Sequence, residues 1–133
     1  MKRGILLLLG IISLSVSAQQ ISPMKAETTA NEFFSQNKLG CTIQTITPRL
    51  DSSGDTLYYI VNATPHHYVI VSASKYVSPV IAWSSTSQFD ASMPFAQILD
   101  NDVASRINNA SLLSGQNKSV ISNQWNMLND GMV

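Results

Sequence analysis

The residues that could carry out nucleophilic or metal chemistry are one cysteine and two adjacent histidines, Cys41, His66 and His67. A thiol enzyme would need Cys41 beside a histidine, in surroundings that lower the thiol pKa. The residues around Cys41 supply no helix N-terminus and no neighbouring base, so we expect a small buried hydrophobic residue beside solvent-facing turn histidines. Adjacent histidines on a strand point to opposite faces, which is poor geometry for one metal ion. We therefore expect no metal and no cofactor.

Paired carboxylates offer no better case for catalysis. Asp100 and Asp102 lie early in a predicted helix, where acidic side chains interact favourably with the helix dipole. Asp51 and Asp55 fall in a predicted polar turn. Sequences typical of a phosphate-binding loop, a nucleophile elbow or a His-Glu zinc site do not occur. We therefore predict that the protein is not an enzyme.

The N-terminus has the pattern of a signal peptide. Lys2 and Arg3 precede an apolar run over residues 5–16, and small residues follow up to Ala18. This pattern predicts a signal peptide of residues 1–18, cleaved before Gln19. The apolar run is shorter than the ~20 residues that a membrane-spanning helix needs. We expect the protein to be exported, to the periplasm or out of the cell, and to have no membrane contact after cleavage.

Cleavage would leave residues 19–133, enough for one domain with one core. Without Lys2 and Arg3 the eight basic residues become six, against eight acidic ones. That near balance argues against nucleic acid or an anionic membrane as partner. With one cysteine no intramolecular disulfide can form, so the domain must depend on its hydrophobic core. We expect a monomer when the protein is free.

The first half of this domain predicts a helix followed by a strand. Residues 25–38 have Ala26, Ala30 and two phenylalanines spaced to share one helix face, and Gly40 is a plausible stop. Residues 41–47 alternate in the manner of a half-buried strand. Residues 48–55 are expected to form a polar loop.

Three short apolar runs separated by turn residues come next, at 56–62, 67–72 and 79–84. The short connection between the first two predicts an antiparallel hairpin, and a proline at the start of the third is allowed in a strand. In the first run, alternation would place Leu57, Tyr59 and Val61 on one face and Tyr58 and Ile60 on the other.

A second helix is predicted from Pro94 to about Ser114, with an apolar stripe that begins at Ile98. The pattern weakens from about residue 116, where either a third helix over 120–128 or a docked irregular tail is possible. The order of elements indicates an α+β domain: an antiparallel sheet of about four strands with two or three helices packed on it.

Four motifs in this region carry a family resemblance: residues 57–62, 68–72, 79–84 and 88–90. They resemble a Leu-Tyr-Val-x-Asn strand, a Phe-Val-Ile-Val-Ser-Gly-Asp strand, a Pro-x-Leu-Gly-Tyr-Ser strand and a Phe-Asp before a helix. That series is the pattern of the prosegment of streptopain-type cysteine proteases and of the Spi family of streptopain inhibitors, in which the module occurs alone. The resemblance spans about Lys25 to Leu113.

The sequence departs from this pattern in two turns and in one loop. Ala73-Ser74 replaces a frequent Gly-Asp, and Ala82-Trp83 replaces a frequent Gly-Tyr. In streptopain the loop between the Phe-Asp and the next helix lies against the active site and carries a blocking Asn. Here that loop lacks Asn. The resemblance implies a protease-blocking loop that consists of Ser92, Met93, Pro94 and Phe95. Met93 and Phe95 would be the side chains that plug the active site. The alternative is that Phe95 packs into the core.

The resemblance implies an inhibitor that blocks the active-site cleft of a streptopain-like (papain-related) cysteine protease. Inhibition in trans is expected because the chain holds no protease domain. Two alternatives are a separately encoded prosegment or folding chaperone of such a protease, and an exported binding domain of unrelated function. A thiol enzyme using Cys41 is a third, and it predicts rapid labelling of that thiol by iodoacetamide.

Overall fold

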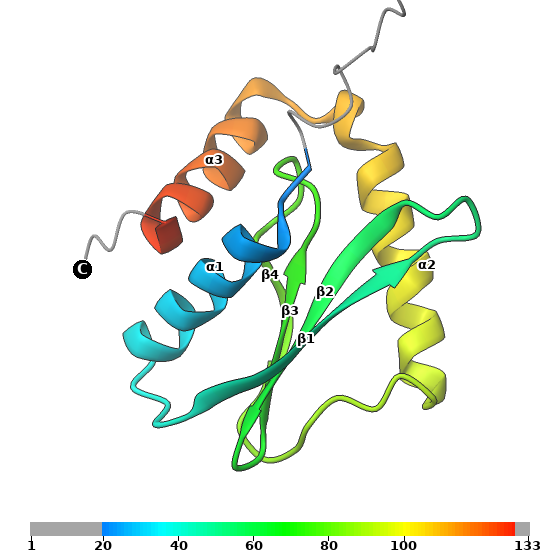
Figure 1. Cartoon of the computed structure of the whole chain (residues 1–133). Coiled ribbons are helices and arrows are strands. Elements are labelled where there is room, and N and C mark those ends of the chain that lie inside the picture. The colour runs from blue at the N-terminus through cyan, green and yellow to red at the C-terminus, as the bar shows by residue number, and fades with distance from the viewer. Residues whose placement is uncertain (1–19, 130–133) are drawn as a thin grey trace, which may run out of the picture.

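Four antiparallel strands lie side by side in chain order, β1-β2-β3-β4, and helices flank them (Figure 1). The computed structural model describes residues 20–129. The elements are α1 (Pro23–Gln36), β1 (Thr42–Leu50), β2 (Thr56–Thr64), β3 (His67–Ser72), β4 (Val80–Ser84), α2 (Pro94–Asn108), a 3₁₀ turn η2 (Ala110–Leu112) and α3 (Gly115–Asn129). The predicted α+β class is confirmed. Among the described residues, none of the helices has the length and apolar character needed to cross a bilayer.

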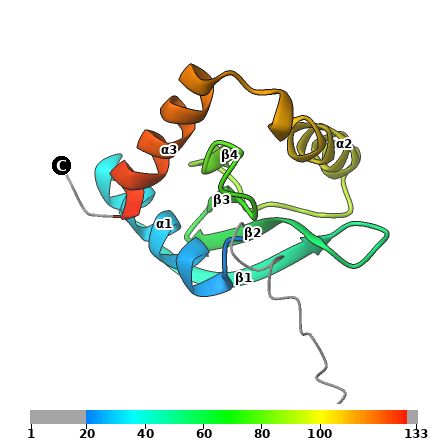
Figure 2. The same cartoon turned by 90° about the horizontal axis from the view of Figure 1, so that it is seen from above.

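Helices cover both faces of the sheet. α1 and α3 pack on one face and α2 packs on the other, which the view from above shows as layers on either side of the strands (Figure 2). The two middle strands are therefore buried on both sides, and Leu57–Val61 of β2 contains no exposed residue. Strands enclosed in this way need apolar residues at successive positions rather than alternate ones. The continuous apolar runs of β2 and β3 follow from this burial.

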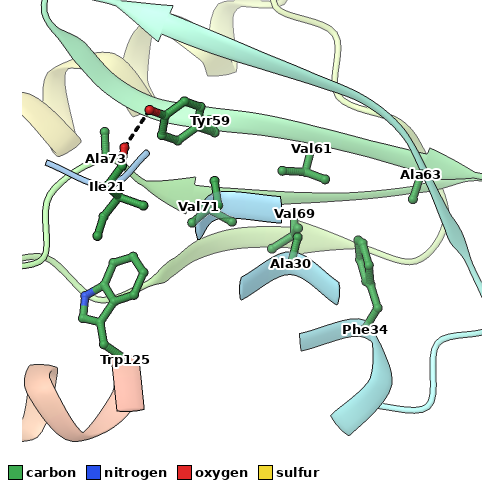
Figure 3. Close-up of a cluster of buried hydrophobic side chains, with 11 residues drawn as sticks. Ile21, Ala30, Phe34, Tyr59, Val61, Ala63, Val69, Val71, Ala73 and Trp125 are labelled. Carbon is green, nitrogen blue, oxygen red and sulfur yellow. Dashed lines mark hydrogen bonds between the residues drawn. The ribbon is translucent and has the colours of Figure 1, made fainter. Parts of the chain in front are cut away.

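The first face of the sheet packs against α1 (Figure 3). Ala26 and Ala30 are fully buried, and such small side chains let a helix lie close to the strands beneath it. The hydroxyl of Tyr59 on β2 donates a hydrogen bond of 2.7 Å to the carbonyl oxygen of Ile21. The helix then begins with Ser22 as its cap, whose hydroxyl accepts from the Lys25 N–H at 3.1 Å. The segment that leads into α1 is thus hydrogen-bonded to a middle strand of the sheet.

α3 completes the same layer, and it decides between the two alternatives left open for the C-terminal segment. The segment is a helix from Gly115, packed beside α1 through the buried side chains of Trp125 and Leu128. The Trp125 indole N–H donates to the carbonyl oxygen of Val77 at 2.9 Å. Tertiary packing of this kind outweighs the low helix propensity of a segment rich in asparagine.

The second face packs against α2 through Leu99 and Val103, which contact Tyr58, Ile60 and Ile70. The predicted apolar stripe of this helix was partly wrong. Its buried positions are Ala96, Leu99 and Val103, while Ile98 is 65% exposed. Leu57 was also wrongly placed, because it packs in this cluster and not with Tyr59.

A polar network ties α2 to two strands. The Arg49 guanidinium of β1 donates to both carboxylate oxygens of Asp100, with Nη2 at 2.8 Å from Oδ2, and the Tyr58 hydroxyl donates to Oδ1 at 2.7 Å. Burial alone would raise the pKa of Asp100, but the hydrogen bonds from Arg49 and Tyr58 outweigh it and lower the pKa. The predicted dipole role was wrong, because neither Asp100 nor Asp102 lies in the first turn of α2. Asp102 instead pairs with Arg106 at 3.0 Å.

Several predicted boundaries also differ. β1 continues to Leu50 through Pro48, which was predicted to lie in a loop. β1 is an edge strand of the sheet. A proline has no N–H to donate, and an edge strand tolerates that loss. α1 ends at Gln36, before the predicted stop at Gly40, and Lys38 takes a left-handed conformation (φ 55°) just beyond the helix. α2 ends at Asn108 rather than near Ser114.

The Arg49–Asp100–Tyr58 network generates a prediction on stability and its pH dependence. Asp100→Asn should lower the free energy of unfolding by about 1–3 kcal/mol, because it weakens the hydrogen bonds from two partly buried donor residues, Arg49 and Tyr58. Because the pKa of Asp100 is lower in the folded than in the unfolded chain, its contribution is present above about pH 4 and lost as the pH falls through the folded value. Urea denaturation at neutral pH and below pH 4 measures both effects.

Asp102→Asn is the matched control, since its exposed pair with Arg106 should contribute less than about 0.5 kcal/mol. Equal losses in the two variants would contradict a special role for Asp100.

Candidate functional site

The loop predicted to block a protease lies at the start of α2. Ser92 and Pro94 are exposed, as are Met93 (56%) and Phe95 (47%). Pro94 is the first residue of the helix, as predicted, and Met93 holds the N-cap position without a side-chain cap. Two large apolar side chains therefore face solvent within one turn of backbone.

The segment that leads to this loop is fastened to β2 by Asn62. The Phe89 N–H donates to Asn62 Oδ1 at 2.8 Å, and Asn62 Nδ2 lies 3.5 Å from the Phe89 carbonyl oxygen. One residue earlier, Gln88 Nε2 donates to the Ala63 carbonyl oxygen at 3.2 Å. These contacts hold residues 88–89 against the sheet, so the exposed tip begins from a fixed point.

An aromatic row continues from the sheet to the tip. Tyr68 of β3 meets Phe89 edge to face with ring centroids 5.2 Å apart, and the Phe95 ring lies 6.2 Å beyond Phe89. Such pairs contribute about 0.5–1.5 kcal/mol beyond the burial of their area. Phe95 thus rests on Phe89 while almost half of it remains exposed. It is not tucked into the core, which was the alternative to a plugging role.

Asp90 shapes the turn between Phe89 and the helix. Its Oδ1 accepts from the Ser92 hydroxyl at 2.6 Å and from the Ser92 N–H at 2.9 Å. These hydrogen bonds, the one from the hydroxyl above all, lower the pKa of the Asp90 carboxyl. The Met93 N–H donates to the Asp90 carbonyl oxygen at 3.2 Å, and the Met93 carbonyl oxygen accepts from the Ala96 N–H at 2.9 Å. The Phe-Asp pair therefore has two tasks: Phe89 anchors the loop and Asp90 turns it.

The residues considered for catalysis do not form a catalytic site. Cys41 is partly buried against the hydrophobic side chains between α1 and the sheet, and burial raises the pKa of its thiol. His67 turns its ring toward Phe34, at 6.5 Å between centroids, while His66 is exposed. Within residues 20–129 there is no group of three or more His, Cys, Asp or Glu side chains that could hold a metal ion. Asp51 stays in the predicted turn, where its Oδ1 accepts from the Asp55 N–H at 3.0 Å.

Comparison with known families identifies the family of this chain. The sequence profile of the Spi protease inhibitor family matches residues 18–107, a span that contains α1, the sheet, the anchored loop and all but the last residue of α2. The chain belongs to the Spi protease inhibitor family. Comparisons with curated proteins and with solved structures gave no match. A protease is therefore the partner that membership implies, and an inhibitor family is generally not one of enzymes, in line with the prediction from the carboxylates and the thiol.

In this member of the Spi family, Asn62 is the residue of the candidate site that sequence reasoning missed, because it holds Phe89 against β2. No role was assigned to Asn62, the last residue of the predicted run 56–62, which in the structure lies inside β2, opposite Tyr68. A signal was present, because the family pattern ends its first strand in Asn. Its role could not be inferred, since the partner Phe89 lies 27 residues further along the chain.

The anchoring role of Asn62 can be tested by amide exchange. Asn62→Ala removes the acceptor for the Phe89 N–H, so that amide should exchange about fivefold faster or more, the equivalent of about one hydrogen bond. Hydrogen exchange followed by NMR measures this. Thr64→Ala, which removes a hydrogen bond between β1 and β2, should leave the Phe89 amide unchanged. Equal protection of Phe89 in the Asn62 variant and the parent would argue against the anchor.

The burial of Cys41 predicts slow chemistry at its thiol. Because the raised pKa leaves less thiolate, iodoacetamide at neutral pH should label the folded protein several-fold more slowly than the same protein in urea. Mass spectrometry of timed samples gives both rates. Rapid labelling of the folded protein would restore the thiol-enzyme hypothesis.

Proposed function

We propose that this protein inhibits a streptopain-like, papain-related cysteine protease in trans, with residues 92–95 set against the active-site cleft. The observation that carries the proposal is the exposure of Met93 and Phe95 on a loop that is otherwise fixed. Solvent-exposed side chains of this size and flexibility suit an apolar protease subsite.

Rigidity of the loop favours tight binding. Ordering a mobile loop on binding costs free energy, and an inhibitor whose loop is already ordered avoids that cost. Here the Asn62 bonds, the Phe89 contact with Tyr68 and the Asp90 turn fix the loop before a protease is met. Only the outer parts of the Met93 and Phe95 side chains would lose conformational freedom when the protease binds.

The backbone supports blocking without cleavage. Met93 is extended (φ −75°, ψ 148°), but the helix begins at the next residue, Pro94. A protease cleaves a segment that lies extended across its cleft on both sides of the scissile bond. A single extended residue followed by a helix cannot supply such a segment, so the loop would fill the cleft without presenting a substrate.

A stable complex needs more surface than four residues offer, at ~800 Å² per partner. Ile98 lies one turn further along α2 and is 65% exposed, so it would extend the contact from Phe95 along the helix. The contact surface would then comprise the loop and the first turns of α2.

The proposed setting is outside the cytoplasm. Residues 1–18, the predicted signal peptide, lie outside the described residues, and export of a monomer to the periplasm or beyond remains part of the proposal. An exported inhibitor would protect the producing cell from its own protease while that enzyme is in transit.

The proposal predicts loss of inhibition when the tip is truncated. A chain beginning at Gln19, which keeps every described residue, should inhibit a cognate protease. Changing Met93→Ala and Phe95→Ala together should raise the inhibition constant by about 100-fold or more, as expected for two central apolar contacts. Progress curves with a fluorogenic peptide substrate measure the constant.

The control is the double variant Met24→Ala with Leu112→Ala, which truncates two similarly exposed apolar side chains elsewhere. It should inhibit like the parent. Full protease activity at micromolar excess of the parent chain would refute inhibition, and an unchanged constant in the Met93 and Phe95 variant would refute the assignment of the loop.

A further inference from the structure

A pocket of about 510 Å³ opens where α3 meets the start of α1 and the turn between β3 and β4. Its volume lies within the range of about 300–1,000 Å³ typical of small-molecule sites. Apolar groups of Ile21, Tyr76, Ile121 and Trp125 line it, and Figure 3 shows Ile21 and Trp125 next to each other at the edge of the core. Much of the wall belongs to α3, which begins after the matched residues 18–107.

Positive charge gathers at this pocket. The described part of the chain has six basic residues, of which Arg49 and Arg106 are in ion pairs. Three of the other four, Lys25, Lys75 and Lys118, line the pocket, and the lining contains no acidic residue. In a chain of balanced composition, this places most of the unpaired positive charge at one concave site.

The geometry strengthens the local positive potential. Lys25 lies in the first turn of α1 and Lys118 in the first turn of α3, where the partial positive charges of the helix N-termini add to those of the side chains. Lys75 Nζ lies 5.6 Å from the centre of the Tyr76 ring, close enough for a cation–π contact. A hollow lined by charge of one sign concentrates counter-ions from solution.

The apolar part of the lining can accommodate the body of a ligand. The indole N–H of Trp125 is already bonded to the Val77 carbonyl oxygen, so the indole offers the pocket mainly its carbon surface. Ile121 lies one helical turn before it on α3. A ligand that fits would have hydrocarbon against these two residues and a negative group among the lysines.

We propose that this pocket binds an amphiphilic anion, a small molecule with an apolar body and a carboxylate or phosphate head. This role is separate from protease inhibition. The pocket lies on the face that carries α1 and α3, and α3 starts near the end of the molecule where α2 finishes, away from the loop that precedes α2 (Figure 1).

Fluorescence of Trp125 gives a direct test. The chain has two tryptophans, and Trp83→Phe leaves Trp125 as the only one. The probes are octanoate and octyl phosphate, which distinguish the two head groups, with 1-octanol as the neutral match. Titration with at least one anion should change the emission and saturate, and the octanol should bind at least tenfold more weakly.

Lysine variants locate the head group. Lys75→Gln and Lys118→Gln should each weaken binding of the anion by about fivefold, the effect expected of one partly exposed charge contact. Lys38→Gln removes an equal charge outside the pocket and should leave affinity unchanged. If Trp83→Phe disturbs folding, the indole N–H signal of Trp125 in a ¹⁵N-correlated NMR spectrum of the parent protein gives the same titration.

Three results would overturn the proposal: no saturable binding of either anion, equal affinity for octanol, or equal weakening by Lys38→Gln and Lys118→Gln. None of them would bear on the protease proposal, because the readout contains no protease.

Discussion

Two neighbouring tyrosines on the central strand hold the helical layers to the sheet from opposite sides. Successive side chains of a strand point to opposite faces, so Tyr58 and Tyr59 both bury their rings, one on each side of β2. Each hydroxyl must then find a partner, because a buried polar group without one is costly. Tyr58 finds Asp100 on α2 and Tyr59 finds the carbonyl oxygen of Ile21. Both layers are thereby positioned relative to one strand, in a chain whose single cysteine allows no internal disulfide.

The same strand also positions the exposed loop. Asn62 and the Ala63 carbonyl oxygen hold residues 88–89, four and five positions along β2 from Tyr58, whose hydroxyl fixes α2 through Asp100. The loop is therefore supported at both ends by one rigid element. Its apolar tip can remain in solvent because the groups that hold it are polar or aromatic contacts behind it. The arrangement separates the residues that fix the loop from the residues available to a partner.

Local sequence patterns were enough to predict the α+β class, the antiparallel hairpin, and the start of α2 at Pro94. They failed where distant contacts decide. Pro48 was interpreted as a loop residue because nothing local shows that β1 lies at an edge of the sheet. The pairing of Arg49 with Asp100 spans 51 residues, and helix α3 depends on the burial of Trp125 against another helix and a turn. The exposed tip at Met93 and Phe95 was proposed from family resemblance, and its surface position became visible only with the packing of Phe89.

The position of Gln20 has a practical consequence for handling the molecule. Gln20 pairs with Ser74 and lines a hollow together with Ala104 and Ile107, in the second half of α2. The exposed loop lies before the other end of that helix. A surface linker joined at Gln20 would therefore leave Met93 and Phe95 facing solution, an orientation suited to capture experiments without any redesign of the chain.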